Sequence, residues 1–111
     1  MKGDSLGELE ELVLLTVGIL YDDAYGLAIT NELQRQSGRK VMLSAVHKVL
    51  VRLENKEYLR SEMSAPQAAR GGRKKKLYFL TEAGRKAVKH AHELRNSMWN
   101  QVPEIVWKPS L

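Results

Sequence analysis

The chain of 111 residues contains no cysteine, which excludes disulfides, thiolate nucleophiles and cysteine-based zinc sites. It also lacks a long hydrophobic run. The longest run, residues 12–20, is interrupted by a threonine and a glycine, and it is far shorter than the roughly 20 apolar residues that span a bilayer. Glutamates rather than basic residues precede it, so it does not resemble a signal peptide. We therefore expect a cytoplasmic protein that does not enter the membrane.

The residue spacings that catalysis and metal binding require are missing as well. His90 and His92 lie two positions apart, so a helix would place them on different sides. This spacing differs from the i, i+4 histidine pair of the H-E-x-x-H zinc motif. The chain contains no nucleophile elbow, phosphate-binding loop or dinucleotide-binding glycine pattern. We expect neither an enzyme nor a protein that needs a metal or cofactor.

Charge is present but unevenly distributed. Residues 1–34 carry one basic and seven acidic side chains, a net charge of −6, whereas residues 35–111 carry 17 basic and six acidic ones, a net charge of +11. The two values sum to the +5 of the whole chain, and five of the seven residues at 70–76 are basic. A basic half favours a polyanionic partner, although a polarised solvated surface would give the same pattern.

The most informative stretch begins at residue 41. We expect a short extended segment at 41–43, followed by a helix whose N-terminus Ser44 caps. The apolar residues of this helix recur at i, i+3, i+4 and i+7, which predicts one buried stripe, and the opposite face is polar and basic. The residues of the stripe are Val46, Val49, Leu50 and Leu53.

A basic hairpin follows this helix. Residues 58–64 and 76–81 are predicted strands, and Gly71 and Gly72 mark the loop between them. A helix with a polar, basic outer face followed by a basic hairpin is the layout of a winged helix-turn-helix. We therefore predict a mainly α (α+β) fold in which residues 1–81 form a DNA-binding winged helix-turn-helix domain with a small antiparallel β-wing.

Two further helices are predicted before residue 41. The first starts at Ser5, which heads a capping box, and it is apolar on nearly all sides, as expected for a helix buried on more than one side. In a chain this short, a second subunit is the best explanation for the extra apolar side. The second helix covers about residues 24–37, with Asp22 or Asp23 as its cap and Gly38 as its left-handed end.

The last predicted helix runs over about residues 82–101 and is capped by Thr81. A helix of about 20 residues is about 30 Å long, which exceeds what a small winged core can cover. We expect residues 82–111 to form a dimerisation helix and tail, with the first helix contributing to the same interface. The expected dimer contacts are Leu9, Leu12, Leu94, Met98 and Trp99.

Five motifs in order resemble the PadR family of transcriptional regulators. They are residues 6–10 with the leucine-valine run after them, 23–29, 50–54, 70–74 and 78–84. The resemblance covers about residues 5–90 and implies a homodimeric winged-helix repressor whose DNA binding responds to phenolic acids, drugs or other small effectors. His47 stands where the family often has tyrosine, and Glu57 stands where it usually has glycine, so the recognition helix is expected to close through Asn55 or Lys56.

In such a dimer, two copies of the helix after residue 43 would enter successive major grooves of double-stranded DNA about 34 Å apart. The loop cations would supply affinity more than specificity. Arg52 has an alternative role as a surface ion-pair partner of Glu54 or Glu57. The expected DNA contacts are Ser44, Ala45, His47, Lys48 and Arg52 from the helix, and Arg70, Arg73, Lys74 and Lys75 from the loop.

Two alternatives remain open from the sequence. Met98 and Trp99 could bind a small aromatic or hydrophobic effector between subunits, or they could serve only as dimer contacts. The alternative function is a winged-helix protein–protein interaction module without DNA binding, which predicts that neutralising residues 70–76 leaves function intact. Single-stranded RNA is disfavoured, because neither the helix nor the loop offers stacking aromatics.

Overall fold

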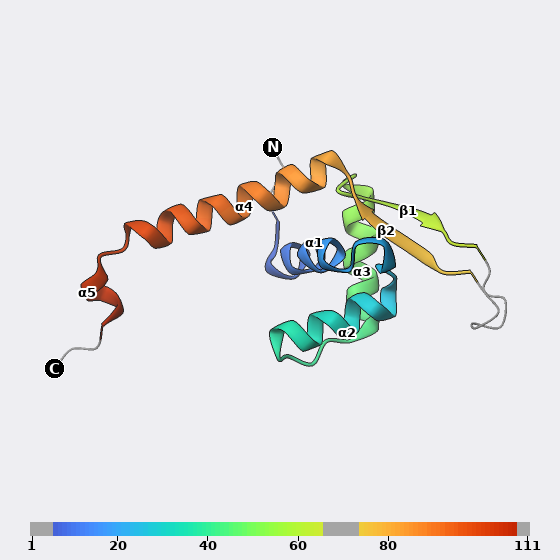
Figure 1. Ribbon diagram of the computed structural model, residues 1–111, viewed down its shortest axis with the longest axis horizontal. Coiled ribbons are helices and arrows are strands. Elements are labelled where there is room, and N and C mark those ends of the chain that lie inside the picture. Colours follow the sequence, from blue (N-terminus) through green and yellow to red (C-terminus); the bar gives the residue numbers. More distant parts are fainter. Residues whose placement is uncertain (1–5, 66–73, 109–111) are drawn as a thin grey trace.

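A computed structural model describes residues 6–65 and 74–108. In these parts, α1–α3 pack around one core, a two-stranded wing lies beside them, and α4 leads away from the core (Figure 1). No helix in the described parts is both long and apolar enough to cross a membrane. The elements are α1 Glu8–Leu20, the 3₁₀ helix η1 Tyr21–Asp23, α2 Gly26–Ser37, α3 Leu43–Asn55, β1 Leu59–Met63, β2 Lys76–Leu80, α4 Glu82–Gln101 and α5 Glu104–Trp107.

The first helix begins later than the capping-box prediction placed it. Gly7 is the N-cap of α1, and its N–H donates to Oε1 of Glu10 at 2.9 Å. Glu10 therefore satisfies a backbone donor at the helix start, the need that the predicted capping box was expected to meet. Ser5 lies outside the described residues. The first turn of α1 is acidic, which suits the positive end of the helix dipole.

The starts of α2 and α3 also differ from the prediction. Asp22 and Asp23 lie in η1, and α2 begins at Gly26 without a side-chain cap. No strand forms at residues 41–43, and Ser44 lies inside α3 rather than capping it. The carbonyl of Met42 accepts from the backbone N–H groups of both Ala45 and Val46, at 3.0 and 3.1 Å, so the helix starts without a hydroxyl. Gly38 ends α2 in the left-handed conformation, as predicted.

The predicted wing is confirmed. Strand β1 pairs antiparallel with β2, in a register that places Leu59 opposite Leu80 and Met63 opposite Lys76. The N–H of Tyr78 donates to the carbonyl of Ala24 at 2.8 Å, which joins β2 to the residues just before α2. Tyr78 is itself buried. The wing is therefore anchored to the helical core at its base.

The junction between α3, the wing and α4 is tightly constructed. The cap of α3 is Lys56, one of the two predicted closures, and Glu57 follows it with a φ of 66°. Thr81 caps α4 as predicted: its hydroxyl oxygen accepts from the N–H of Gly84 at 3.0 Å and donates to the carbonyl of Glu57 at 2.6 Å. This pair of bonds fixes the start of α4 against the end of α3.

The core lies between α1, α2, α3 and the wing. The whole predicted stripe of α3 is buried, with exposures of 2% or less. Buried side chains of α1, α2 and the wing complete the cluster; they include Val13, Leu14, Val17, Ile29, Leu33 and Leu59.

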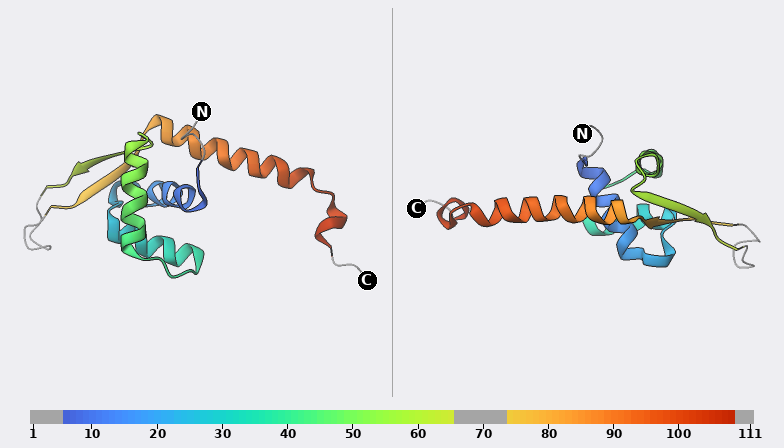
Figure 2. Two further views of the ribbon diagram at one scale, coloured as in Figure 1. Left: turned by 180° about the vertical axis from the view of Figure 1, so that it is seen from behind. Right: turned by 90° about the horizontal axis from the view of Figure 1, so that it is seen from above.

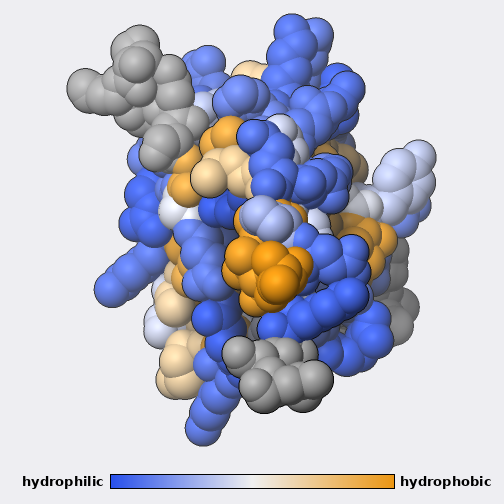
Figure 3. Space-filling model, turned by 90° about the vertical axis from the view of Figure 1, so that its left-hand side faces the viewer, coloured by the Kyte–Doolittle hydropathy of each residue, from blue (hydrophilic) through white to orange (hydrophobic). Residues whose placement is uncertain are grey.

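The C-terminal helix leaves this core early. Within α4 only Gly84 is buried, and the wing and α4 project from opposite sides of the core (Figure 2). The described structure measures 62 Å along its longest axis against 34 and 21 Å along the others. Figure 3 looks at the end of the molecule that carries the C-terminus, where an apolar patch is surrounded by hydrophilic side chains. Among the described residues, the distal part of α4 therefore covers no core.

Candidate nucleic-acid interface

The outward side of α3 carries the residues predicted to contact DNA. Ser44, Lys48 and Arg52 follow one another at four-residue intervals, so they lie along one side of the helix, and all three are exposed. His47 is exposed beside them, and Ala45 is half-buried. Within the described residues, the side chain of Lys48 forms no hydrogen bond or ion pair. Its charge is thus available to an external anion.

The start of α2 brings α3 close to the wing. A β-carbon at Gly26 would lie 3.7 Å from Cδ1 of Leu43 and 3.8 Å from Nδ1 of His47, so α2 begins beside the first turns of α3. The neighbouring Tyr25 carries Nζ of Lys75 over its ring, 3.6 Å from the centroid, in a cation–π contact. Tyr25 and Gly26 therefore lie between the outward side of α3 and the loop end of β2. The sequence prediction did not foresee this role for Tyr25.

The wing contributes further positive charge. Lys74 is exposed, and Lys75 is half-buried against Tyr25. Arg70 and Arg73, also predicted to contact DNA, lie outside the described residues. Glu54 links α3 to the wing, because it accepts a hydrogen bond from the Ser61 hydroxyl at 2.6 Å and lies 3.6 Å from Nζ of Lys76.

Arg52 forms an ion pair, but not with the partners that the sequence suggested. Its Nε donates to Oε2 of Glu10 at 3.1 Å, whereas Glu54 contacts Ser61 and Lys76 of the wing. Nζ of Lys56 donates to both oxygens of the same carboxylate, at 3.1 and 3.0 Å. Glu10 is 42 positions from Arg52 in the sequence, so no local spacing could have identified this cluster. Lys56 and Glu10 were both missed for this reason.

The environment of Glu10 lowers the pKa of its carboxyl group. Burial by itself disfavours the charged carboxylate, but the backbone N–H of Gly7 and the side chains of Lys56 and Arg52 hydrogen-bond to it and outweigh burial. The net effect lowers the pKa of Glu10 below its ordinary value. Glu10 is therefore ionised at neutral pH, and its cluster holds a negative charge between two cations.

Other acidic side chains at the start of α1 reach further elements. Glu11 pairs with Arg95 of α4, and Glu8 lies 3.5 Å from Nη1 of Arg39, which precedes α3. Together with Glu10, these residues tie the start of α1 to three other parts of the chain. The acidic N-terminal third thus binds cations of the basic remainder within the same molecule, which the charge count alone did not reveal.

The residues predicted for dimerisation fall into two groups. Leu94, Met98 and Trp99 are 53, 61 and 59% exposed, so they are accessible from solvent. Leu9 and Leu12 are partly buried against the core of their own chain. On α1 the exposed apolar residues are instead Leu15 and Ile19.

Trp99 also has a contact within the chain. Its ring stacks on that of Trp107 in α5, with centroids 4.3 Å apart and an interplanar angle of 18°. The tail, for which the sequence predicts no role, thus folds back against the end of α4. The stacked pair remains exposed on its outer side, since Trp107 is 48% exposed.

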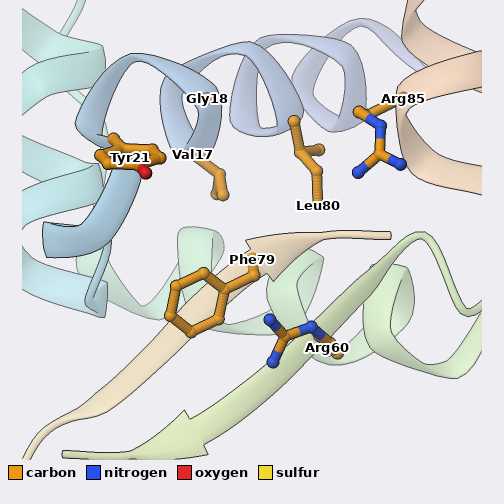
Figure 4. A pocket seen from close by; sticks show the side chains of 7 residues that line it. All are labelled: Val17, Gly18, Tyr21, Arg60, Phe79, Leu80 and Arg85. Carbon is orange, nitrogen blue, oxygen red and sulfur yellow. The ribbon is translucent and has the colours of Figure 1, made fainter. Parts of the chain in front are cut away.

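A shallow hollow opens between α1, the wing strands and the start of α4, with a volume of about 300 Å³ (Figure 4). The guanidinium group of Arg60 lies 4.5 Å from the centroid of the Phe79 ring and pairs with Glu62. Of the two arginines that line the hollow, Arg60 therefore already has partners within the chain. Met98 and Trp99, the predicted effector contacts, do not line this hollow. Its lining residues are Val17, Gly18, Tyr21, Arg60, Phe79, Leu80 and Arg85.

Comparison with known proteins identifies this arrangement. The model of the transcriptional regulator PadR-like family matches residues 14–90, which is more than half of the chain. The chain belongs to the PadR-like family. Proteins of this family are transcription regulators, so membership makes this chain a PadR-like transcription regulator, the class that its motifs resembled. The match spans the segment from α1 to the first half of α4.

Solved structures show the same fold as this PadR-like chain. A PadR-like transcriptional regulator from Bacillus cereus is 17% identical with a TM-score of 0.74, over 91% of this chain and 93% of that one. A PadR family regulator from Clostridium difficile is 25% identical with a TM-score of 0.64, over 80% and 91%. The complex structure of hsRosR-S1 is 28% identical with a TM-score of 0.66, over 87% and 79%. A search of curated proteins gave no match.

Proposed function

We propose that this protein is a homodimeric, sequence-specific DNA-binding repressor that binds a pseudo-palindromic operator. The supporting observation is the position of Tyr25 and Gly26, which lie between the outward side of α3 and the loop end of β2 in the wing. Because of this arrangement, the cations of α3 and the wing belong to one surface, as backbone and groove contacts on the same duplex require. In this proposal, residues 1–81 bind DNA and residues 82–111 form the dimerisation helix and tail.

The helix and the wing have different roles on DNA. Ser44 and Ala45, at the start of α3, reach base edges in the major groove, and Lys48 reaches a guanine edge or a phosphate. His47 donates to a phosphate from the margin beside α2. The wing cations Arg70, Arg73, Lys74 and Lys75 contact the sugar–phosphate backbone, so they raise the affinity for all sequences alike.

The second subunit covers the exposed apolar residues of α4 and α1. A helix that carries Leu94, Met98 and Trp99 at 53% exposure or more is stabilised when these side chains leave water. Leu15 and Ile19 on α1 offer a second apolar strip, and the predicted contacts Leu9 and Leu12 lie on the same helix. Dimerisation places two α3 helices on one duplex.

A small aromatic or hydrophobic effector releases the repressor in this proposal. Met98 and Trp99 form its contacts between the two subunits, where a planar ligand can add to the stacked Trp99–Trp107 pair. Binding is detectable as quenching of tryptophan fluorescence. A ligand that quenches the fluorescence of the wild-type protein, but not that of a Trp99→Leu variant, identifies this site.

The central experiment is selection of duplexes from a random library, followed by affinity measurements at several salt concentrations. A dimer should select two half-sites whose centres lie about 10 base pairs apart, or a multiple of this. Lys48→Ala should weaken binding to the selected duplex. Lys89→Ala should not, although it removes the same charge, because Lys89 is an exposed residue of α4 that lies 4.0 Å from Glu93.

The wing is tested separately. The double variant Lys74→Ala, Lys75→Ala should lower the slope of log K against log salt by about 0.9 for each DNA phosphate that the wing no longer neutralises. Removing Lys86 and Lys89 from α4 is the charge-matched control. If the wild-type protein binds no duplex even at low salt, DNA binding is refuted, and the winged-helix interaction module becomes the better explanation.

A further inference from the structure

Glu10 is the one charged residue that is buried among residues 6–65 and 74–108. It belongs to α1, yet its carboxylate accepts hydrogen bonds from two cations of α3 and its C-terminal cap, Arg52 and Lys56. A buried carboxylate is tolerated when charged donors satisfy its oxygens. The N–H of Gly7 adds another bond at 2.9 Å. The geometry of the cluster is therefore fixed by four donor–acceptor contacts.

The two cations are used differently. Lys56 is 22% exposed at its side chain and contacts both carboxylate oxygens, so it acts mainly as the counter-ion. Arg52 is 55% exposed and contacts the carboxylate through Nε alone. Within the described part of the chain, its terminal Nη1 and Nη2 groups form no hydrogen bond or ion pair. A guanidinium group is planar with five donors, so holding Nε fixes the direction of the other two nitrogens.

Arg52 also lies at a useful position. It follows Lys48 at four-residue spacing on the outward side of α3, toward the end of the helix where α1 approaches. An arginine at the end of a recognition helix lies near the edge of the groove, where phosphate oxygens are its partners. Bidentate contact with a phosphate needs the guanidinium plane to be oriented in advance.

We propose that Glu10 is a positioning residue for DNA binding, which holds Arg52 by Nε and directs its Nη1 and Nη2 groups toward a DNA phosphate. This inference rests on the DNA-binding function proposed above. The opposite effect, in which Glu10 withholds Arg52 from DNA, would require the side chain of Arg52 to be as little exposed as that of Lys56. The exposure of Arg52 argues against withholding.

The test compares Glu10→Gln, Arg52→Ala and the double variant in the full-length protein. The probes are a duplex that the wild-type protein selects from a random library and a scrambled duplex of the same composition. Each single variant should lower the affinity for both duplexes by about tenfold, because a phosphate contact carries no sequence information. The double variant should be no worse than Arg52→Ala alone. Arg52→Ala should also reduce the salt slope by about 0.9, since one fewer phosphate is neutralised.

Two further variants separate positioning from general destabilisation. Glu10→Asp keeps the charge but shortens the side chain, so it should also lower the affinity for both duplexes. Lys56→Gln removes the counter-ion but keeps the Arg52–Glu10 contact, and it should preserve both affinities within about twofold. Thermal unfolding measured alongside shows that each variant is folded at the assay temperature, so a lower affinity then reports the lost contact and not a loss of folded protein.

Three results would overturn the inference. If the Glu10→Gln variant binds both duplexes more tightly and with a steeper salt slope, Glu10 withholds cations from DNA. An unchanged affinity for Glu10→Gln, beside a reduced affinity for Arg52→Ala, would show that Arg52 needs no positioning. A wild-type protein that selects no sequence would refute the proposed function and this inference with it. The first two results leave the proposed function intact.

Discussion

Replacing Gly84 by alanine should destabilise the protein strongly, although alanine normally favours helices. Gly84 lies in the first turn of α4 and is buried. A β-carbon there would lie 2.0 Å from the carbonyl oxygen of Tyr58 and 2.9 Å from its carbonyl carbon. Both atoms belong to the backbone, so no side-chain rotation relieves the overlap. The start of α4 must move away from the residue that leads into β1.

The magnitude follows from the hydrogen bonds that this movement breaks. Overpacking costs about 1–3 kcal/mol and occasionally more, and an overlap with rigid backbone belongs at the upper end. The N–H of Thr81 donates to the carbonyl of Tyr58 at 3.2 Å, and the hydroxyl of Thr81 donates to the carbonyl of Glu57 at 2.6 Å. Breaking each of these bonds costs about 1 kcal/mol. Alanine regains about 1 kcal/mol of helix propensity. We expect a net destabilisation of about 4 kcal/mol.

Urea unfolding at one fixed protomer concentration measures this destabilisation, because the apparent stability of the proposed dimer depends on concentration. Gly18→Ala is the matched control. Gly18 lies in α1, where the nearest atom to a β-carbon is Cδ1 of Leu80 at 3.6 Å, an ordinary contact, so alanine should stabilise by up to about 1 kcal/mol. If Gly84→Ala is as stable as Gly18→Ala, the tight approach of α4 to Tyr58 is refuted.

Further predictions concern Glu57 and Glu10. Glu57→Gly should raise the free energy of unfolding by about 0.5–1 kcal/mol, because the left-handed φ of 66° strains a residue with a β-carbon. Glu57→Ala keeps the β-carbon and should not stabilise in the same urea titration; equal gains for both variants would argue against backbone strain. Glu10 has a folded pKa below its unfolded value of about 4.5, so its ionised form stabilises the fold above that pH. This contribution is lost as the pH falls through the folded pKa. The stability difference between wild type and Glu10→Gln should therefore be constant near neutral pH and shrink in acid, and a difference that does not change down to about pH 3 would contradict the lowered pKa.

The sequence by itself determined the order and type of the main elements. The apolar stripe of α3 requires burial on one side of a helix, and all four of its residues are buried. The left-handed end at Gly38, the cap at Thr81 and the two wing strands follow from local chemistry within a few residues of each site. Local signals of this kind depend on short-range hydrogen bonds and side-chain periodicity, which a sequence displays directly.

Tertiary structure alone decided which partners distant residues find. The helix starts at Gly7 and Met42 were missed because the Glu10 carboxylate and the Met42 carbonyl, rather than a hydroxyl, accept the bonds there. The bond of Glu10 to Arg52 spans 42 positions, and the contact of Lys75 with Tyr25 spans 50. Both depend on how α1, α2 and the wing pack around α3. Side-chain pairing at such separations is set by the packed core, and no sequence period encodes it.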